Sequence, residues 1–534
     1  MKNYPQRIRY IIPRIAIPAL ACMSLALSSL AASRPNVVII YGDDVGYGDV
    51  GVNGSTLIPT PNIDRLAAEG LNFTDGHCTA STCTPSRFSL LTGIHAFRYK
   101  ARILPPNAPL IVPTDEFTLG SLFKKVDYRT SIIGKWHLGL GEKRKPVNWN
   151  SSVKPGPMEL GFDYSFLVPS TNDRVPCVYL KGHHVVGLEP TDPLYVARKL
   201  EEVRSKSDST QYPYGVANPE AMTYYKNSTG HADSVINGIG RIGFMAGGAS
   251  ALWDDETISD VLVAEAVRFI EENKEEPFFL FFSAVDIHVP RTPHPRFQGS
   301  TSLGYRGDAM VQFDWATGAI MESLEKHGLK NNTIVIFSSD NGPAFDNGYK
   351  DGTTVVASSQ EVDGGHDASG IWRGGKGQIW EAGTRVPFII RWPANIQPGT
   401  SAATVSQVDL LASFAALLGV ELQENEAIDS RNLLSAFLGK DEQGSEYLIE
   451  ESFNLALRHS DWKYVEATRV RDQDGKPMPL PESLFKLDDD RMEQNNLIER
   501  HPEKAASMKA MLESLKNGDG LRNELGESPN NRKQ

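Results

Sequence analysis

Cysteine and basic residues are both scarce in this chain of 534 residues. It has four cysteines, and its 54 Lys and Arg are outnumbered by 66 Asp and Glu, which leaves a net charge of -12. A nucleic-acid-binding protein usually carries a basic surplus or a basic block, so we expect no nucleic-acid partner. The balance of 40% hydrophobic and 22% charged residues is ordinary for a globular protein, and it excludes the disordered and collagen-like classes.

Long apolar runs are lacking as well, apart from one near the N-terminus. There, three arginines precede the stretch IAIPALACMSLALSSLAAS, which has the order of a signal peptide: a basic region, an apolar region and small residues at the cleavage site. Pro18 and several serines interrupt the run, so cleavage is favoured over a retained membrane anchor. We therefore predict a signal peptide over residues 1–33, a periplasmic or secreted location, and no stable membrane insertion.

Export places the chain in an oxidising compartment, where disulfides can form. Cleavage would remove Cys22 and leave Cys78, Cys83 and Cys177. Three is an odd number, so at least one of these cysteines is not in an intramolecular disulfide.

Short runs rich in β-branched residues alternate with helical patterns along the chain. Strands are predicted at 36–41, 130–134, 277–282, 333–339 and 386–390. This alternation predicts an α/β fold with a large, mostly parallel sheet sandwiched by helices. Residues 140–250 lose the pattern and are predicted to be an insertion of loops. We expect one domain over 34–435 and a smaller C-terminal α+β subdomain over 436–534, with an antiparallel sheet and a closing helix.

Polar residues follow four of the predicted strands, at the edge where an open parallel sheet binds its ligands. These are Asp43 and Asp44, then Lys135 and His137, then Asp286 and His288, then Asp340 and Asn341. Each of these segments taken alone is consistent with an ordinary turn. Ordinary turns do not explain why such polar residues recur directly after four different strands. Carboxylate and amide oxygens form a cage suited to Ca²⁺ or Mg²⁺, and a metal bound through the histidines is the less favoured alternative.

Cys83 is predicted at the start of a helix. Pro85 fits the first turn and Gly93 a C-cap position. Free N–H groups at a helix N-terminus favour an anion, and Arg87 lies one turn further along. A disulfide with Cys78 and a thiol nucleophile both remain open at this point.

The motif C-x-P-S-R-x-x-x-L-T-G, from Cys83 to Gly93, resembles the signature of the type I, formylglycine-dependent sulfatases of the alkaline-phosphatase-like superfamily. The segments GDDVGYGDVG, TPNIDRLAAEG, GKWHLG, SSDNG and RGGKGQIWEAGTRVPFIIRWP are similar to this family too, so the resemblance covers most of the mature chain. Ile94 departs from the pattern, which usually has a basic residue there. The resemblance implies a sulfuric ester hydrolase of the carbohydrate sulfatase or arylsulfatase type.

The resemblance also implies the cofactors and the roles of the site residues. Cys83 would be oxidised to formylglycine by a formylglycine-generating enzyme, which leaves Cys78 and Cys177 as an even pair. One divalent metal, with Ca²⁺ expected first and Mg²⁺ second, would be held by Asp43, Asp44, Asp340 and Asn341. The sulfate and the formylglycine oxygens would be bound by Arg87, Lys135 and Lys376. His288 would protonate the leaving alcohol, and His137 would be the base that allows sulfate to leave.

The exported location and the 140–250 insertion favour a glycan substrate over a small phenolic ester. Polar clusters in that insertion are Asp173 with Arg174 and His183 with His184. An adjacent carboxylate and guanidinium could bind vicinal sugar hydroxyls or form an ordinary salt bridge. By family analogy, the candidate substrate is a 6-O-sulfated galactose-type sugar.

Two alternative functions are a phosphate or phosphonate monoester hydrolase of the same superfamily and a non-catalytic exported glycan-binding protein. A non-catalytic glycan-binding protein of this fold would have lost at least one residue of the catalytic core, and none of these residues is missing from the sequence. The sequence leaves the oligomeric state open.

Overall fold

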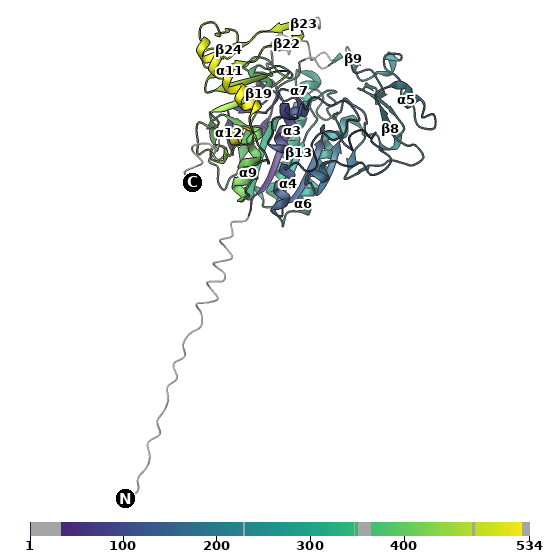
Figure 1. Cartoon of the computed structure of the whole chain (residues 1–534). Helices are drawn as coiled ribbons and strands as arrows, with labels where there is room; N and C mark the ends of the chain where they lie inside the picture. Colours follow the sequence, from purple (N-terminus) through teal and green to yellow (C-terminus); the bar gives the residue numbers. More distant parts are fainter. Residues whose placement is uncertain (2–33, 228–229, 346–347, 351–364, 472–475, 526–534) are drawn as a thin grey trace.

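The computed structural model describes Met1 and residues 34–227, 230–345, 348–350, 365–471 and 476–525. Figure 1 shows the whole chain. The predicted signal peptide, apart from Met1, lies outside the described residues. Within the described part of the chain, no helix is both long and apolar enough to cross a bilayer.

A ten-stranded sheet forms the centre of the molecule. In spatial order its strands are β17 (Gly399–Ser401), β2 (Leu71–Phe73), β16 (Ile389–Arg391), β14 (Thr333–Ser339), β1 (Asn36–Gly42), β13 (Phe278–Ser283), β4 (Arg129–Lys135), β5 (Tyr164–Val168), β6 (Leu180–Lys181) and β7 (His184–Val185). The four strands β14, β1, β13 and β4 are adjacent and mutually parallel. Val38 of β1, for example, pairs with Val335 on one side and Leu280 on the other.

Helices cover both faces of this sheet, as predicted. One layer contains α3 (Cys83–Thr92), α4 (Leu119–Lys125) and α9 (Leu410–Leu418), and the other α2 (Pro61–Ala68), α6 (Ile258–Glu272) and α7 (Gly304–Lys326). Phe123 of α4 stacks on Phe279, whereas Phe269 of α6 meets Phe278 edge-on. Successive strand residues point to opposite faces, so α4 and α6 lie on opposite sides. This explains why the central strands are apolar along their whole length.

Two sequence predictions about this sheet need correction. Residues 140–250 are not only loops, because β5 extends the main sheet in parallel with β4, and β6 and β7 continue it. The run YSFLV is too short and too isolated to stand out beside the long apolar strands. The strand predicted at 386–390 is shifted to Ile389–Arg391 and runs antiparallel to β14, so the sheet is mixed at that edge.

A second, antiparallel sheet follows near the C-terminus, as predicted. It contains β19 (Tyr447–Glu451), β20 (Leu455–His459), β21 (Trp462–Val465) and β24 (Ser483–Lys486), and α11 (Pro502–Asn517) packs on it. A hairpin of β22 (Thr468–Arg471) and β23 (Pro477–Leu480) lies next to it in sequence. In Figure 1 this C-terminal part and the β8–α5 part of the 140–250 segment lie on opposite sides of the main sheet.

A buried charge cluster connects the C-terminal sheet to the main-sheet part. The Lys463 side chain is fully buried, and its Nζ lies 3.1 Å from Glu381, 2.8 Å from Glu450 and 3.2 Å from Glu493. Glu381 belongs to α8 (Glu381–Thr384), which precedes β16, while Lys463 belongs to β21. Buried charges are tolerated only when they are paired, so these contacts hold the two parts in one arrangement.

Replacing Lys463 with methionine should therefore be strongly destabilising. Three buried carboxylates would lose their shared cation, and breaking such a pair costs about 3–5 kcal/mol. Urea unfolding measures this change. The matched control is Lys509→Met, because Lys509 pairs with Glu482 at the surface, where such a pair contributes about 0–1 kcal/mol. Equal decreases in the free energy of unfolding for the two variants would contradict this role of Lys463.

Candidate active site

The residues that follow the four central strands meet at one edge of the main sheet. The backbone N–H of Asp44 donates to Oδ1 of Asp340 at 3.2 Å. Lys135 Nζ lies 2.5 Å from Asp43 Oδ1 and 3.4 Å from Asp340 Oδ2. Asp286 does not join them, because its Oδ1 accepts a hydrogen bond from Gln312 of α7 at 2.8 Å. The parallel order of the strands thus brings the adjacent carboxylates of Asp43 and Asp44 together with that of Asp340, which is distant in sequence.

Each of these buried carboxylates has a cation beside it. Lys135 contacts Asp43, and Lys376 Nζ lies 2.6 Å from Asp44 Oδ1. Arg87 Nε donates to Asp340 Oδ2 at 2.9 Å, and its Nη1 donates to the Lys135 carbonyl and to Ser283 Oγ. Together the three cations offset the three carboxylate charges. The crevice therefore has cationic groups in place for an anion and oxygen ligands in place for a metal.

The oxygens of this cluster fit a hard divalent cation. Asp43 Oδ2 and Asn341 Oδ1 are buried and have no hydrogen-bond partner among the described residues. Asn341 Nδ2 donates to Asp44 Oδ1 at 2.8 Å, which turns its own Oδ1 away from that carboxylate. Unpaired buried acceptors are costly, and Ca²⁺ or Mg²⁺ would satisfy them with the oxygen donors these ions prefer.

Cys83 begins α3 and faces this cluster. The predicted helix start and C-cap are confirmed, since α3 spans Cys83–Thr92 and Gly93 adopts a left-handed φ of 67°. Cys83 Sγ lies 3.9 Å from Asp43 Oδ1. Cys83, Asp43, Asp44 and His288 each offer an atom within 4.8 Å of the others. The start of the C-x-P-S-R motif therefore lies in the crevice.

Neither simple alternative for Cys83 agrees with its surroundings. Cys78, Cys83 and Cys177, the cysteines in the described part of the chain, are all free, so the Cys78–Cys83 disulfide is absent from the structure. Burial, with the charge of Asp340, raises the pKa of the Cys83 thiol to about 12. A thiol with such a pKa is almost entirely protonated at neutral pH, which disfavours a thiolate nucleophile.

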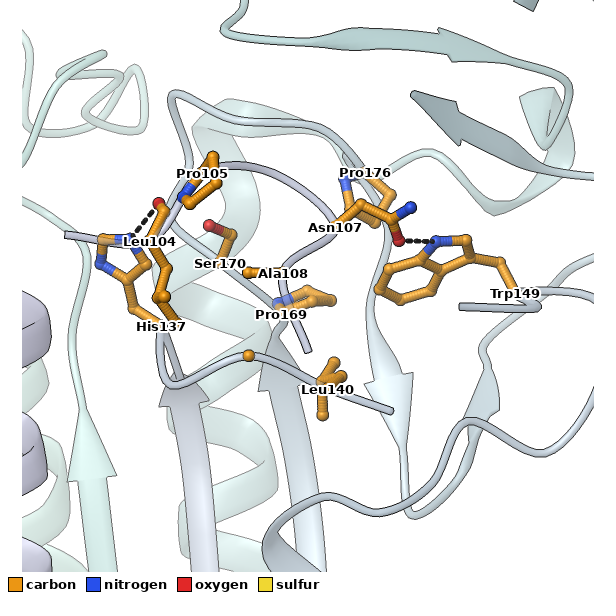
Figure 2. Close-up of a pocket in the computed structure, with 11 residues that line it drawn as sticks. Leu104, Pro105, Asn107, Ala108, His137, Leu140, Trp149, Pro169, Ser170 and Pro176 are labelled. Carbon is orange, nitrogen blue, oxygen red and sulfur yellow. Dashed lines mark hydrogen bonds between the residues drawn. The ribbon is translucent and has the colours of Figure 1, made fainter. Parts of the chain in front are cut away.

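His137 follows β4 and is held by the loop that contains Leu104. Its Nε2 lies 3.2 Å from the Leu104 carbonyl oxygen, and Figure 2 shows this carbonyl turned toward the ring. The same loop is fixed by Asn107, whose side-chain oxygen accepts from Trp149 Nε1 at 3.1 Å. A carbonyl only accepts, so Nε2 carries the proton and Nδ1 carries the lone pair. Nδ1 is buried and has no partner among the described residues.

His288 is oriented in the opposite sense. Its Nδ1 lies 2.6 Å from the Val289 carbonyl and 3.2 Å from Asn172 Oδ1, so Nδ1 donates and Nε2 faces Asp44 at 3.9 Å. Burial is the main cause that lowers the pKa of each histidine well below its usual range. Arg174 and Lys135 add to this effect at His137, as Lys376 and Lys135 do at His288.

The Asp173–Arg174 pair from the 140–250 segment lies beside the two histidines. The side chains are 2.5 Å apart, and Asp173 is buried. Asp173 Oδ2 also lies 3.2 Å from His231 Nε2. Asn172, the preceding residue, donates to the carbonyls of His288 and Pro290. Asn172 belongs to the polar stretch 170–174 that stood out in the sequence, although no role was predicted for it. His231, which has no spacing signal, was missed by the sequence analysis.

His183 and His184 are not brought to this crevice. They lie at the β6–β7 turn, where Gly182 N donates to the carbonyl of Ser165 near the start of β5. His183 Nε2 contacts Glu159 at 2.9 Å, and His184 is exposed. Because β6 runs antiparallel to β5, this turn lies at the far end of the sheet from the strand ends that carry Lys135 and Asp340. We therefore leave both residues out of the site.

Comparisons with known proteins agree with this geometry. A model of the sulfatase family matches residues 35–420. The N-acetylgalactosamine-6-O-sulfatase of Bacteroides thetaiotaomicron is 44% identical over 530 residues, which is 97% of this chain and 100% of the relative. Human steryl-sulfatase is 30% identical over 460 residues, covering 82% of this chain and 76% of the relative. Relatives within this family therefore act on different sulfate esters.

Solved structures give the same assignment. A Bacteroides thetaiotaomicron sulfatase from a locus for the metabolism of multiple glycosaminoglycans has a TM-score of 0.85 at 43% identity, covering 91% of this chain and 100% of that one. A phosphonate monoester hydrolase of Agrobacterium radiobacter has a TM-score of 0.55 at 19% identity, covering 90% and 95%, and so shares only the fold. The family match spans the Cys83 motif, the strand-end carboxylates and the Lys376 loop, and the chain therefore belongs to the sulfatase family and is a sulfuric ester hydrolase.

Proposed function

We propose that this enzyme removes the sulfate ester from O6 of a galactose-type sugar, with N-acetylgalactosamine 6-sulfate as the first candidate. The observation that carries this proposal is the buried Asp173–Arg174 pair beside His137 and His288. A paired carboxylate and guanidinium present acceptors and donors together, which suits adjacent hydroxyls of a sugar ring. The 44% identical relative that is an N-acetylgalactosamine-6-O-sulfatase supports the same substrate class.

We propose one divalent metal ion, Ca²⁺ before Mg²⁺, held by Asp43, Asp44, Asp340 and Asn341. When bound, it supplies positive charge for sulfate oxygens and for the oxygen that attacks sulfur. Arg87, Lys135 and Lys376, each beside one of these carboxylates, bind the remaining negative charge of the sulfate. Arg87 and Lys135 are buried, which makes their charges more effective than at the surface, because little water screens them.

Residue 83 is proposed to act as formylglycine, made from Cys83 by a formylglycine-generating enzyme. One hydroxyl of the hydrated aldehyde gives its proton to the Asp43 carboxylate, which lies 3.9 Å from Cys83 Sγ. Its oxygen bonds to sulfur as the sulfur–oxygen bond to the sugar breaks. His288 gives a proton from Nε2 to the departing sugar oxygen. Because Nδ1 donates to Val289, this step needs the doubly protonated ring. Burial and the nearby lysines disfavour that form, and the negative charge of a bound sulfate ester favours it. His137 Nδ1 takes the proton of the remaining hydroxyl on residue 83. The aldehyde C=O then re-forms, and the bond between its carbon and the sulfate oxygen breaks, which releases sulfate.

We also propose that residues 1–33 direct export, that 34–435 form the catalytic domain and that 436–534 form a C-terminal subdomain. The phosphate or phosphonate alternative is less favoured. The set of two histidines, two lysines and a cysteine modification motif suits a sulfate ester, and the phosphonate hydrolase is similar only in fold. The glycan-binding alternative does not explain why every core group of the crevice is in place.

The first test concerns residue 83. Peptide mass spectrometry of active protein should find the aldehyde at this position, while the peptides with Cys78 and Cys177 keep their thiols. Cys83→Ala should lose essentially all activity, and Cys177→Ser serves as the control for loss of a buried cysteine. Full activity in protein that contains only unmodified Cys83 would overturn the proposal.

The second test concerns the two histidines, which act at different steps. General acid–base groups contribute about 10²–10⁴-fold, and a good leaving group needs no acid. His288→Ala should therefore lose activity on a sulfated sugar but keep much more of it on nitrophenyl sulfate. His137→Ala should stop after one turnover on either substrate, with sulfate retained on residue 83 by mass spectrometry. The reverse pattern would mean that the roles are exchanged.

The third test concerns the sugar. Hydrogen bonds to charged groups contribute about 1.5–3 kcal/mol, so Arg174→Ala should reduce kcat/KM on N-acetylgalactosamine 6-sulfate by roughly 10- to 100-fold. Nitrophenyl sulfate, which lacks sugar hydroxyls, should be affected much less. His184→Ala is the matched control, because this exposed side chain lies away from the crevice. Equal activity of the natural enzyme on the 4-sulfate and 6-sulfate isomers would argue against the proposed position.

A further inference from the structure

Two pockets open beside the active-site crevice, and the loop 452–454 between β19 and β20 lines both. Their volumes are about 490 Å³ and about 380 Å³. Gly377 lines the larger pocket, and Thr82 lines the smaller. These two residues are the chain neighbours of Lys376 and Cys83. Both pockets therefore lie at the rim of the reaction centre.

The loop 452–454 is fixed to that rim by hydrogen bonds. The Glu451 carbonyl accepts from the Ser81 backbone N–H at 2.8 Å. Ser452 Oγ donates to the Gly377 carbonyl at 2.8 Å. The position of Phe453 relative to the crevice is thus determined by the fold and not by an unattached surface loop.

An apolar surface is exposed at this rim. Phe453 is 72% exposed, and two other exposed apolar side chains line the same pair of pockets, Ile103 at 42% and Met478 at 47%. Isolated apolar residues are common on surfaces, but a group of them beside a polar site indicates a binding surface. An aromatic ring offers a flat apolar face, which matches the C–H face of a sugar ring.

Positive charge accompanies this apolar surface. Lys100 and Arg102 line the smaller pocket and Arg469 lines the larger. All three are exposed, and none forms an ion pair with a carboxylate of the described chain. The smaller pocket also contains Glu466, which is paired with Lys516 at 2.8 Å, and Glu451, whose pKa burial raises to about 8. The whole chain has a net charge of -12, so this local group of cations has the opposite sign to the net charge of the protein. It favours a ligand that carries negative charge.

We propose that these two pockets form a subsite for the sugars that adjoin the sulfated one. A neighbouring sugar stacks on Phe453, and the three cations bind carboxylate or sulfate groups further along the chain. This inference rests on the proposed function and adds the substrate class: an anionic oligosaccharide in place of a single sulfated sugar.

The kinetic test compares two substrates with the same sulfated end. One is N-acetylgalactosamine 6-sulfate, and the other is an oligosaccharide in which this sugar is followed by a hexuronate and further units. The natural enzyme should have the higher kcat/KM on the oligosaccharide. One aromatic contact is worth up to about tenfold, so Phe453→Ala should lower the ratio of the two kcat/KM values by about that factor. Phe453→Tyr should restore it.

Matched variants separate the subsite from general effects. Val216→Ala changes another apolar residue, 65% exposed, that lines neither pocket, and should leave the ratio unchanged. Arg469→Gln should raise KM for the oligosaccharide and weaken its dependence on salt, because exposed charges are screened by ions. An equal value of kcat/KM on the two substrates in the natural enzyme would overturn the subsite, as would an unchanged ratio in Phe453→Ala.

Direct binding distinguishes failure of the subsite from failure of the proposed function. Titration calorimetry with the hexuronate-containing oligosaccharide that lacks the 6-sulfate should show binding to the natural protein and weaker binding to Phe453→Ala. If no sulfated sugar is hydrolysed but this difference persists, the proposed substrate is wrong and the subsite stands. If the 6-sulfate is hydrolysed but the two proteins bind the oligosaccharide equally, the subsite is wrong and the proposed function stands.

Discussion

Three buried carboxylates at the ends of parallel strands, each beside a lysine or arginine, determine the geometry of this active site. Charges inside a protein are stable only when they are paired closely. Arg87 extends from the first helical turns after Cys83 to Asp340 after β14, and Lys135 joins β4 to Asp43 after β1. The helix that presents residue 83 is thus held against the strand ends by the same ion pairs that compensate the carboxylates of the proposed metal site.

The C-terminal sheet also helps to position the groups of the active site. Lys376, which contacts Asp44, belongs to a loop that is tied to β19 and β20 through Ser452 and Gly377. Further along this segment, Glu381 contacts the buried Lys463 of β21. A cation of the reaction centre is therefore positioned partly by residues about 80 positions further along the chain. This also explains why the C-terminal sheet lies close enough to contribute Phe453 to the rim.

Hydrogen bonds, more than charge, distinguish the two histidines. The Leu104 carbonyl holds the proton of His137 on Nε2 and leaves the lone pair on Nδ1, whereas the Val289 carbonyl holds a proton on Nδ1 of His288. Two chemically identical side chains thus keep opposite ring nitrogens free of carbonyl contacts, Nδ1 in His137 and Nε2 in His288. The neighbouring Arg174 and Asp173 place the proposed sugar contacts next to both of them.

Several parts of this structure were predictable from local sequence. Strands such as 36–41 and 333–339 are recognisable because burial on both faces requires continuous apolar runs. The start of α3 at Cys83 follows from Pro85 and Gly93, and the strand-end positions of Asp43 and Asp340 follow from the parallel order. The weak strand β5 and the shift of β16 were not predictable, because short strands take their stability from the neighbours with which they pair.

The sequence by itself determined the family, through the Cys83 motif, and the identity of the groups that meet at the strand ends. Only the tertiary structure decided which nearby polar residues join them. It brought Asp173 and Arg174 to the two histidines and left His183 and His184 at the opposite end of the sheet. It also turned Asp286 toward Gln312 and placed Phe453 at the rim. The reason is that local sequence dictates the type of each element, whereas the direction and order of the strands dictate which ends come together in space.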